Sequence, residues 1–558
     1  MQGIYNNYNA ETPGSYMPRF WAYKTLGFYA QDDIRVNSRL TVNVGLRYET
    51  MTVPTARYGF NSRFLNFGDP SQTWSSGSIY RNASKLNFSP RMGFAWDVAG
   101  NGKTAVRGAF GIYEDVGTVG GALQQNAFAM PPFSAVSTVA NNPTNAVISL
   151  PLPFSPANVG NTLKGMNYNI GQPHSYQYNI GVQQALPFGV GVAVSYVGNR
   201  GLRLWQSKEG NPVLPTAIVN GAQQWQPYIC GGQPSVLTCP GATANPAYHR
   251  INPNWGSWVQ VGTGAKSWYD SLQLVVNKRL SHGLQAQGTY AFSKSLDTAT
   301  GVATGLDCTL SGELQGSDPL QPALDKGPSC SDQRHVVHLN VLYHLPDVKS
   351  DRMVAKVLNG WWVGSIFTTT SGFPFTPNLT VNRSNSGVLS NFADRVNVGT
   401  NSTTGTFPCS GSGSAFPGAP ACSNGSVTYQ FVPYNAGTVI TGDPNMWFNP
   451  LMFRLGNTGS LGQASRGMLR GPGAATWDAS INKDTRIPRL GESARLEFRA
   501  EIFNLLNHTN FSTPSGSVFA GTLTDPAGAS EAPIANVGKI TSTSSNSRQI
   551  QLALKLIF

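Results

Sequence analysis

Charged residues are scarce in this chain of 558 residues. Asp, Glu, Lys and Arg together make up 12% of the sequence, roughly half the share that is usual in soluble globular proteins. Long apolar runs are also missing: no stretch approaches 18 consecutive apolar residues, which excludes a membrane-spanning helix. Strands that cross a membrane alternate polar and apolar residues, so the mean hydropathy of −0.19 does not argue against them.

The first 20 residues lack both the basic and the apolar segment of a secretory signal peptide. A secreted membrane protein needs such a signal. Either this chain is not a secreted membrane protein or the start of the protein is absent from it, and we expect the second.

A clustered basic patch is missing too. The formal net charge is +12, but the 39 Lys and Arg residues are scattered, mostly singly within alternating segments. Nucleic-acid binding requires a concentrated patch of positive charge. The sequence therefore predicts no nucleic-acid partner.

Motifs for catalysis, cofactors and metals are absent as well. The stretch 100–104, GNGKT, resembles the end of a phosphate-binding loop, but the full pattern needs Gly where this chain has Asp97, and a glycine turn between two strands explains it better. His335 and His338 would lie on opposite faces of a strand, whereas His338 and His344 would share one face as hydrogen-bonded residues. We predict no catalytic residue, no cofactor and no metal site, and hence no enzyme.

Alternation with period two is what the sequence has in abundance. In 39–50, RLTVNVGLRYET, the apolar side chains fall on one face and the polar ones on the other. About thirteen segments satisfy this criterion, each long enough to cross a bilayer as a tilted strand. They are 24–35, 39–50, 86–98, 103–114, 174–186, 189–199, 268–280, 283–294, 334–345, 359–371, 475–486, 492–505 and 547–558.

The connections between these segments alternate between short and long. The long ones are 51–85, 115–173, 200–267, 295–333, 372–474 and 506–546. Outer-membrane barrels combine tight turns at one end with long external loops at the other, whereas soluble domains seldom contain loops of this length. The fold class predicted is all-β, an antiparallel transmembrane β-barrel with long extracellular loops.

Two sets of side chains follow from this interpretation. Aromatic residues near strand ends suit a girdle at the membrane interface, although ordinary core packing explains any single one equally well; they are Tyr48, Trp96, Tyr113, Tyr196, Trp268, Tyr269, Tyr290, Phe292, Trp361, Trp362 and Trp477. Charged residues on the polar faces of the strands are predicted to line the lumen; they are Arg47, Glu49, Arg107, Arg495, Glu497, Arg499 and Glu501. Opposite charges at alternate positions favour salt bridges in a solvated interior over acid–base catalysis.

The six cysteines form three pairs that are local in sequence, and each pair lies in a different predicted loop. Six cysteines allow fifteen connectivities, and sequence alone does not choose among them. One pair per loop makes local disulfides the simplest hypothesis, with an oxidising compartment. The pairs are Cys230 with Cys239, Cys308 with Cys330, and Cys409 with Cys422.

Several segments resemble the barrel of Oar-like TonB-dependent receptors. The resemblance spans nearly the whole chain and diverges in the long loops; it is carried by FYAQDDIRVNSRLTVNVGLRYE (28–49), SPRMGFAWDVAGNGKTAVRGAFGIYED (89–115), HSYQYNIGVQQAL (174–186), YDSLQLVVNKRLSHGLQAQGTYAFSKSLD (269–297), DQRHVVHLNVLYHLP (332–346), FRAEIFNLLNHTNF (498–511) and RQIQLALKLIF (548–558). It implies an outer-membrane location and TonB-driven uptake through a plugged barrel. Full-length members carry a signal peptide, a carboxypeptidase-regulatory-like domain and a plug, none of which is present in 1–558.

The resemblance also sets the expected extent of the chain. Such barrels have about 22 strands, so residues 1–558 are interpreted as the C-terminal part of one, truncated at its N-terminus. The last strand looks like the C-terminal signal that the barrel-assembly machinery reads, formed by Ile550, Leu552, Leu554, Leu556 and Phe558. Expected partners are outer-membrane lipid and lipopolysaccharide, the assembly machinery, the TonB complex through the missing N-terminal region, and a transported ligand whose identity the sequence does not reveal.

Two functions follow from these expectations. In the first, external loops capture a ligand for energised uptake across the outer membrane. The alternative is a structural or adhesive surface protein in which the barrel only anchors long loops such as 372–474, which is rich in Ser, Gly, Thr and Asn.

Overall fold

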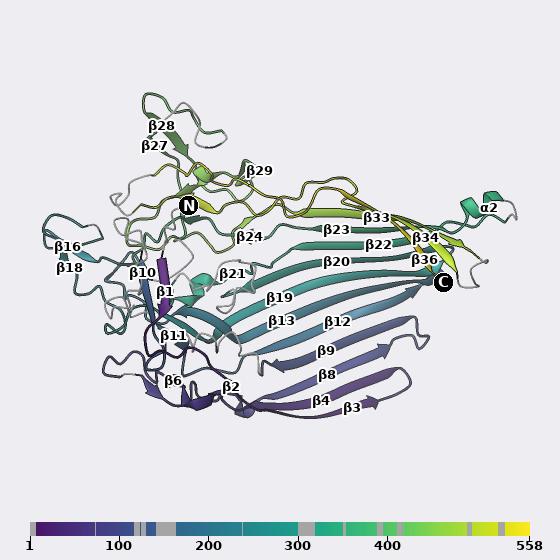
Figure 1. Ribbon diagram of the computed structural model, residues 1–558, viewed down its shortest axis with the longest axis horizontal. Helices are drawn as coiled ribbons and strands as arrows, with labels where there is room; N and C mark the ends of the chain where they lie inside the picture. The colour runs from purple at the N-terminus through teal and green to yellow at the C-terminus, as the bar shows by residue number, and fades with distance from the viewer. Residues whose placement is uncertain are drawn as a thin grey trace.

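The computed structural model describes residues 7–72, 74–116, 123, 130–140, 163–236, 238–299, 318–349, 353–387, 394–409, 416, 418–487, 494–522 and 531–557. Its main feature is a large antiparallel sheet whose thirteen long strands follow one another in chain order (Figure 1). They are β3 (Thr25–Arg35), β4 (Leu40–Met51), β8 (Phe88–Asp97), β9 (Thr104–Glu114), β12 (His174–Leu186), β13 (Val190–Glu209), β19 (Trp258–Ser281), β20 (Leu284–Asp297), β22 (His335–His344), β23 (Trp361–Thr370), β33 (Ala474–Arg486), β34 (Arg495–Phe503) and β36 (Gln549–Ile557). The all-β antiparallel fold and its thirteen predicted strands are confirmed.

Shorter elements occupy the connections. The strands among them are β1 (Asn7–Glu11), β2 (Trp21–Ala22), β5 (Thr55–Ala56), β6 (Ser62–Arg63), β7 (Ser75–Ser76), β10 (Val136–Ala140), β11 (Leu163–Met166), β14 (Ala217–Val219), β15 (Ala222–Gln224), β16 (Tyr228–Cys230), β17 (Gln233–Ser235), β18 (Thr243–Ala244), β21 (Gly327–Pro328), β24 (Pro374–Phe375), β25 (Asn378–Leu379), β26 (Asn397–Val398), β27 (Thr403–Pro408), β28 (Ser426–Phe431), β29 (Ile440–Asp443), β30 (Met446–Phe448), β31 (Phe453–Arg454), β32 (Leu469–Arg470) and β35 (Ser517–Phe519). The helices are α2 (Met353–Leu358) and the 3-10 turns η1 (Arg57–Gly59), η2 (Ser84–Leu86), η4 (Pro187–Gly189), η5 (Pro322–Asp325) and η6 (Pro450–Met452). Within the described ranges, no helix combines the length and the apolar character needed to span a membrane.

The sheet has one apolar and one polar face. Residues directly opposite each other on paired strands project to the same face, so the register can be followed from strand to strand. Val44 lies opposite Met92, and Met92 lies opposite Phe110. On the last strand of the sheet, Leu552 lies opposite Ala500 and its side chain is 72% exposed. Because an apolar band this exposed is unfavourable in water, this face requires an apolar environment.

The short turns gather at one end of the sheet and the long connections at the other (Figure 1). In the turn between β8 and β9, the carboxylate of Asp97 accepts hydrogen bonds from the backbone N–H groups of Gly100 (2.9 Å) and Gly102 (2.8 Å). Both glycines have a φ near +70°, at 71° and 69°, a conformation that favours residues without a Cβ. The stretch 100–104 is therefore a glycine turn capped by Asp97.

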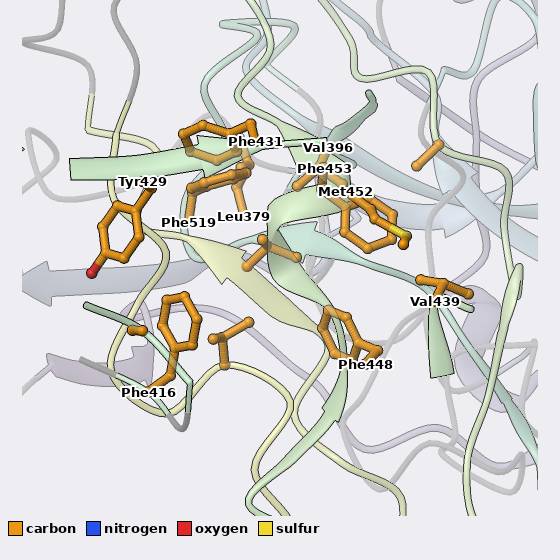
Figure 2. Close-up of a cluster of buried hydrophobic side chains, with 14 of the residues drawn as sticks. Leu379, Val396, Phe416, Tyr429, Phe431, Val439, Phe448, Met452, Phe453 and Phe519 are labelled. Carbon is orange, nitrogen blue, oxygen red and sulfur yellow. The ribbon is translucent and has the colours of Figure 1, made fainter. Parts of the chain in front are cut away.

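Much of the long connections is folded and packed. The largest buried cluster combines side chains from the connection between β23 and β33 with side chains from the connection between β34 and β36, and Figure 2 shows Val439, Phe448, Met452, Phe453 and Phe519 from it. A second cluster joins Met51, Ile79 and Tyr80 to Met166 and Val261. We call these folded connections the loop cap, because they cover one end of the sheet (Figure 1).

The predicted loop 200–267 is partly wrong. Its first and last residues extend the β13–β19 hairpin to Glu209 and Trp258, and β11 joins β19 in a parallel pairing. The register shifts between Gly201 and Leu204 and again between Leu204 and Trp205. Such bulges interrupt the alternation, which hid the extension in the sequence.

A core substitution tests whether the loop cap is a packed unit. Phe453 is fully buried in the largest cluster, at 0% exposure. We expect Phe453→Ala to destabilise the cap by about 3–5 kcal/mol through lost burial and an unfilled cavity, which should speed proteolytic cleavage within 372–474. The matched control is Phe373→Ala in the same connection, where the ring is 43% exposed. Equal cleavage rates for the two variants in detergent-solubilised protein would contradict a packed cap.

Candidate functional site

The seven charged residues predicted to line the lumen lie on one face of the sheet. Arg47 lies opposite Ser89, and Ala95 on the same strand lies opposite Arg107, so β4, β8 and β9 share this face. On each following pair of strands, positions of this face again lie opposite one another. The last of these pairs joins Ser480 on β33 to Glu501 on β34. Alternation then places Glu49 beside Arg47, and Arg495, Glu497 and Arg499 beside Glu501. We refer to this surface as the polar face.

Opposite charges pair within single strands of the polar face. Arg47 Nη2 lies 2.6 Å from Glu49 Oε1. Arg499 bridges two carboxylates, with Nη2 2.7 Å from Glu497 Oε1 and Nη1 3.5 Å from Glu501 Oε1. Side chains two residues apart on a strand are same-face neighbours, so each arginine finds its partner locally. Such part-exposed pairs favour a solvated, charged surface.

A cavity of about 410 Å³ opens on the polar face between β3, β4, β8 and β9. Side chains of Tyr29, Arg47, Arg91 and Tyr113 line it, and Gly45, Gly93 and Ala109 contribute small positions. The Arg91 guanidinium carbon lies 4.4 Å from the centroid of the Tyr113 ring, within cation–π range. Of these four residues, the sequence predicted Arg47 to line the lumen and Tyr113 to belong to the girdle, whereas it singled out neither Tyr29 nor Arg91. The period-two pattern of 89–97 does place Arg91 on the polar face, but only the register brings it beside Arg47.

Three of the aromatic residues predicted to form a girdle lie on the polar face. Tyr113, Tyr269 and Trp362 occupy positions of the same parity as Arg107, Ser271 and Gly364 in their strands. The girdle prediction was wrong for these three, because they cannot contact an apolar phase on the other face. The remaining eight lie on the apolar face; they are Tyr48, Trp96, Tyr196, Trp268, Tyr290, Phe292, Trp361 and Trp477.

The histidines of β22 divide between the two faces. His335 belongs to the apolar face and its Nδ1 lies 2.9 Å from the hydroxyl of Tyr290. His338 and His344 share the polar face, and His338 Nδ1 lies 3.1 Å from Thr368 Oγ1. Within the described residues, no three His, Cys, Asp or Glu side chains come together as metal ligands.

Ion pairs join different loops of the cap. Arg395 pairs with Asp325, Arg466 with Asp297, and Arg470 with Asp332. The side chains of the three aspartates are 7%, 11% and 1% exposed, respectively, so removing one arginine would leave a nearly buried carboxylate without its counter-charge. Each pair joins the connection between β23 and β33 either to the last residue of β20, Asp297, or to the connection between β20 and β22.

One buried carboxyl group of the cap has a perturbed pKa. Burial raises the pKa of Asp394 to about 6, and hydrogen bonds from Ser384 oppose the rise. A raised pKa in a cleft can indicate acid–base chemistry. Asp394 is only 8% exposed and accepts a hydrogen bond from the backbone N–H of Ser384, so its carboxylate joins two parts of the connection between β23 and β33.

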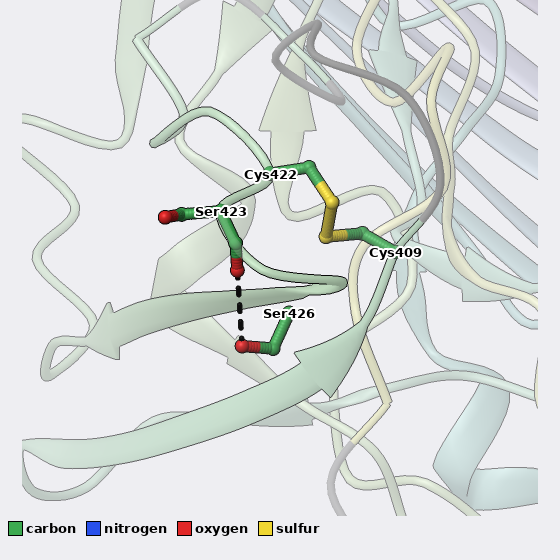
Figure 3. The surroundings of a disulfide bond; sticks show 4 residues. All are labelled: Cys409, Cys422, Ser423 and Ser426. Carbon is green, nitrogen blue, oxygen red and sulfur yellow. Dashed lines mark hydrogen bonds between the residues drawn. A yellow bond between two sulfur atoms is a disulfide. The ribbon is translucent and has the colours of Figure 1, made fainter.

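Disulfides close two hairpins of the cap. Cys230 is joined to Cys239, and Cys409 to Cys422, with Cα atoms 5.8 Å apart in each pair. Figure 3 shows the second bond beside Ser423 and Ser426, where Ser426 Oγ donates to the carbonyl oxygen of Ser423 at 3.3 Å. Cys330 is also disulfide-bonded, and Cys308 lies outside the described residues.

The residues predicted as the assembly signal occupy the last strand. Ile550, Leu552, Leu554 and Leu556 lie on the apolar face of β36, opposite Ile502, Ala500, Phe498 and Leu496. Phe558 lies outside the described residues. The assembly role itself stays a prediction.

Comparison with known proteins gives one family match. Residues 1–551 match the family described as "Outer membrane beta barrel domain". A search of curated proteins gives no match.

Solved structures of outer-membrane proteins are similar at low identity. The outer membrane transporter YddB from Escherichia coli gives a TM-score of 0.42 at 10% identity, covering 95% of this chain and 45% of that chain. The siderophore receptor PiuA from Acinetobacter baumannii gives 0.39 at 10%, covering 96% and 43%. The FrpB iron transporter from Neisseria meningitidis gives 0.38 at 9%, covering 96% and 46%. The chain therefore spans less than half the length of each of these structures.

The family match extends over nearly the whole chain and agrees with the two-faced antiparallel sheet. The exposed apolar face then has its apolar environment in the hydrocarbon of a membrane. This chain belongs to the outer membrane beta-barrel domain family and is located in the outer membrane.

Proposed function

We propose that this protein is the barrel portion of an Oar-like TonB-dependent transporter, which captures a ligand with its external loops and takes it across the outer membrane. The observation that supports the proposal best is the combination of a folded loop cap with a polar face that continues across all thirteen strands. A ligand needs both features in turn, a shaped surface for capture and a polar path for passage. The segments that resemble Oar-like receptors supply the link to TonB.

In such a transporter, the loop cap and the polar face would have different roles. The loop cap, held together by its buried clusters and ion pairs, would form the capture surface. The polar face would line the lumen. The cavity lined by Tyr29, Arg47, Arg91 and Tyr113, called here the Tyr29–Tyr113 cavity, would contact a ligand as it passes. TonB would supply the energy, and the apolar face of β36 would be read by the barrel-assembly machinery.

The alternative is a surface protein in which the barrel only anchors its loops. The β27–β28 hairpin, closed by the Cys409–Cys422 disulfide, extends from the cap and could display a binding surface (Figure 1). Most of the connection between β23 and β33, however, packs into a common core with residues of the connection between β34 and β36. A shared core fixes loops relative to one another, which favours capture at the barrel mouth over free display.

Uptake in the native host tests the proposal. Strains lacking either this gene or tonB are compared with the parent for initial uptake of ferric siderophores, cobalamin, oligosaccharides and peptides. We expect one ligand class to lose uptake in both mutants, with restoration by the full-length gene. Unchanged uptake of every class, together with a loss of surface adhesion in the gene deletion, would support the anchoring alternative.

A cavity-filling substitution tests the path on the polar face. A Cβ added at Gly45 would meet nothing closer than 3.4 Å, so Gly45→Leu fills the Tyr29–Tyr113 cavity without forcing the backbone. We expect this variant to lower the rate of uptake of the identified ligand while outer-membrane levels stay normal. The control is Gly191→Leu, on the same face of β13, where a Cβ has open space. Equal uptake by the two variants would exclude the cavity from the path.

Charge placement on β36 tests which face meets lipid. Leu552 lies on the apolar face and the adjacent Gln551 on the polar face. A lysine facing lipid costs about 2–4 kcal/mol at the bilayer midplane, so Leu552→Lys should reduce assembled protein strongly and Gln551→Lys only slightly. Heat-modifiable mobility of outer-membrane fractions on gels measures assembly. Similar losses for both variants would contradict the assignment of the faces.

A further inference from the structure

The apolar face carries a group of cations at its loop-side end, on the neighbouring strands β13, β19 and β20. Arg200 on β13 lies opposite Trp268 on β19. Lys294 on β20 lies opposite Asp270, which follows Trp268 by two residues on β19, toward the turn-side end of the sheet. Alternation along β19 continues this face to Lys266. Lys326, which follows η5, reaches the same place, because its Nζ lies 4.4 Å from the centroid of the Trp268 ring.

This group sits at the height of the outer membrane surface. Arg200 follows the first residue of β13, Val190, by ten positions, roughly 34 Å along an antiparallel strand. At a strand tilt of about 45° this corresponds to a height of about 24 Å, close to the apolar band of about 25 Å in outer-membrane barrels. The cations therefore lie at the interface on the loop side, which is the extracellular side in such barrels.

The group contains one carboxylate, and that carboxylate is already engaged. Arg200 Nη2 lies 2.8 Å and 2.9 Å from the two carboxylate oxygens of Asp270, and the hydroxyl of Tyr196 donates to the same group. The Arg200 guanidinium also lies 5.6 Å from the ring of Tyr178. Asp270 is thus bound by Arg200 and Tyr196, and it lies beyond salt-bridge distance of Lys294.

The three lysines have no such partner. Lys266, Lys294 and Lys326 are exposed, and no described residue accepts a hydrogen bond from their ammonium groups or forms a salt bridge with them. Lysines at the turn-side end of the same face differ: Lys278 Nζ donates to the carbonyl oxygen of Arg279, and Lys483 Nζ to that of Asn359. Among the described residues, the loop-side group therefore places three ammonium groups without a hydrogen-bond or salt-bridge partner beside aromatic rings, and that of Lys326 lies over the ring of Trp268.

We propose that Lys266, Lys294 and Lys326, arranged around Trp268 beside Arg200, bind the phosphate groups of a phosphorylated lipid in the outer leaflet. Ammonium groups attract anionic head groups at a membrane surface, and several acting together favour a multiply charged one. The rings of Trp268 and Tyr196 suit the boundary between head groups and acyl chains. The proposal depends on the outer-membrane location and not on transport.

Lipid binding by the full-length protein tests this site. The protein is purified in detergent, and its affinity for bisphosphorylated lipid A is compared with its affinity for the dephosphorylated lipid. We expect the double variant Lys294→Gln/Lys326→Gln to bind the bisphosphorylated lipid at least about tenfold more weakly than the wild type. The control Lys103→Gln/Lys349→Gln removes the same charge from exposed positions at the turn-side end and should bind as the wild type does.

Three results would overturn the site. The first is equal affinity of the two double variants, and the second is equal affinity of the wild type for phosphorylated and dephosphorylated lipid. The third is displacement of the lipid by millimolar inorganic phosphate, which would assign the lysines to a free anion. Because both variants change exposed lysines, their gel mobility with and without heating should match the wild type, and loss of uptake is not part of the readout.

Discussion

The hydrogen bonds between strands are the constraint on which the rest of this structure depends. Hydrocarbon offers no partner to a backbone N–H or C=O group, so a chain that crosses it with strands must pair them with one another. Thirteen strands pair in an unbroken order from β3 to β36, and within the described residues only the outer edges of these two strands carry no long neighbouring strand. Once the pairing is fixed, the strand period of two decides where every side chain goes. A slip of one residue at any pair would place charged residues such as Arg499 in lipid.

The loop cap relies on a different balance of forces. It lies in water, where buried apolar side chains such as Phe448 and Phe453 stabilise it. Its loops are long, and closing long loops costs conformational entropy. Disulfides limit that cost within the two hairpins that they close, and the arginine–aspartate pairs fix the orientation between loops. The cap can therefore hold a defined surface above a sheet whose strands differ in length.

Features of the fold and the site could be predicted from the sequence where they depend on one short segment, and not where they depend on segments far apart in the chain. The thirteen strands could be predicted, because alternation is a property of one short segment at a time. The placement of Arg495, Glu497, Arg499 and Glu501 on one face followed from the same property. That Arg47 lies on the same face as these four residues did not follow from this property, since it depends on the register of every strand pair between β4 and β34.

The features that sequence reasoning missed are non-local or irregular. The cavity needs Tyr29, Arg47, Arg91 and Tyr113 from four different strands. The ion pairs of the cap join residues 70, 169 and 138 positions apart, and aspartates and arginines in loops carry no signal of their partners. The extension of β13 and β19 was hidden by bulges around Leu204. The cavity and the ion pairs were missed because distant segments form them, and the strand extension was missed because the bulges interrupt the alternation.

The choice between arginine and lysine in this chain follows the surroundings of each cation. The nearly buried aspartates of the cap pair with Arg395, Arg466 and Arg470, whose planar guanidinium groups present several donors in a fixed geometry. The exposed cations at the ends of the apolar face are mainly lysines, whose flexible apolar stems can cross the edge of the hydrocarbon and carry the ammonium group to the head groups. Arg200, the arginine of the loop-side group, is bound by Asp270 and lies against the ring of Tyr178. The low charge content agrees with this two-faced arrangement, because one face of every strand meets lipid, where a charged side chain is costly.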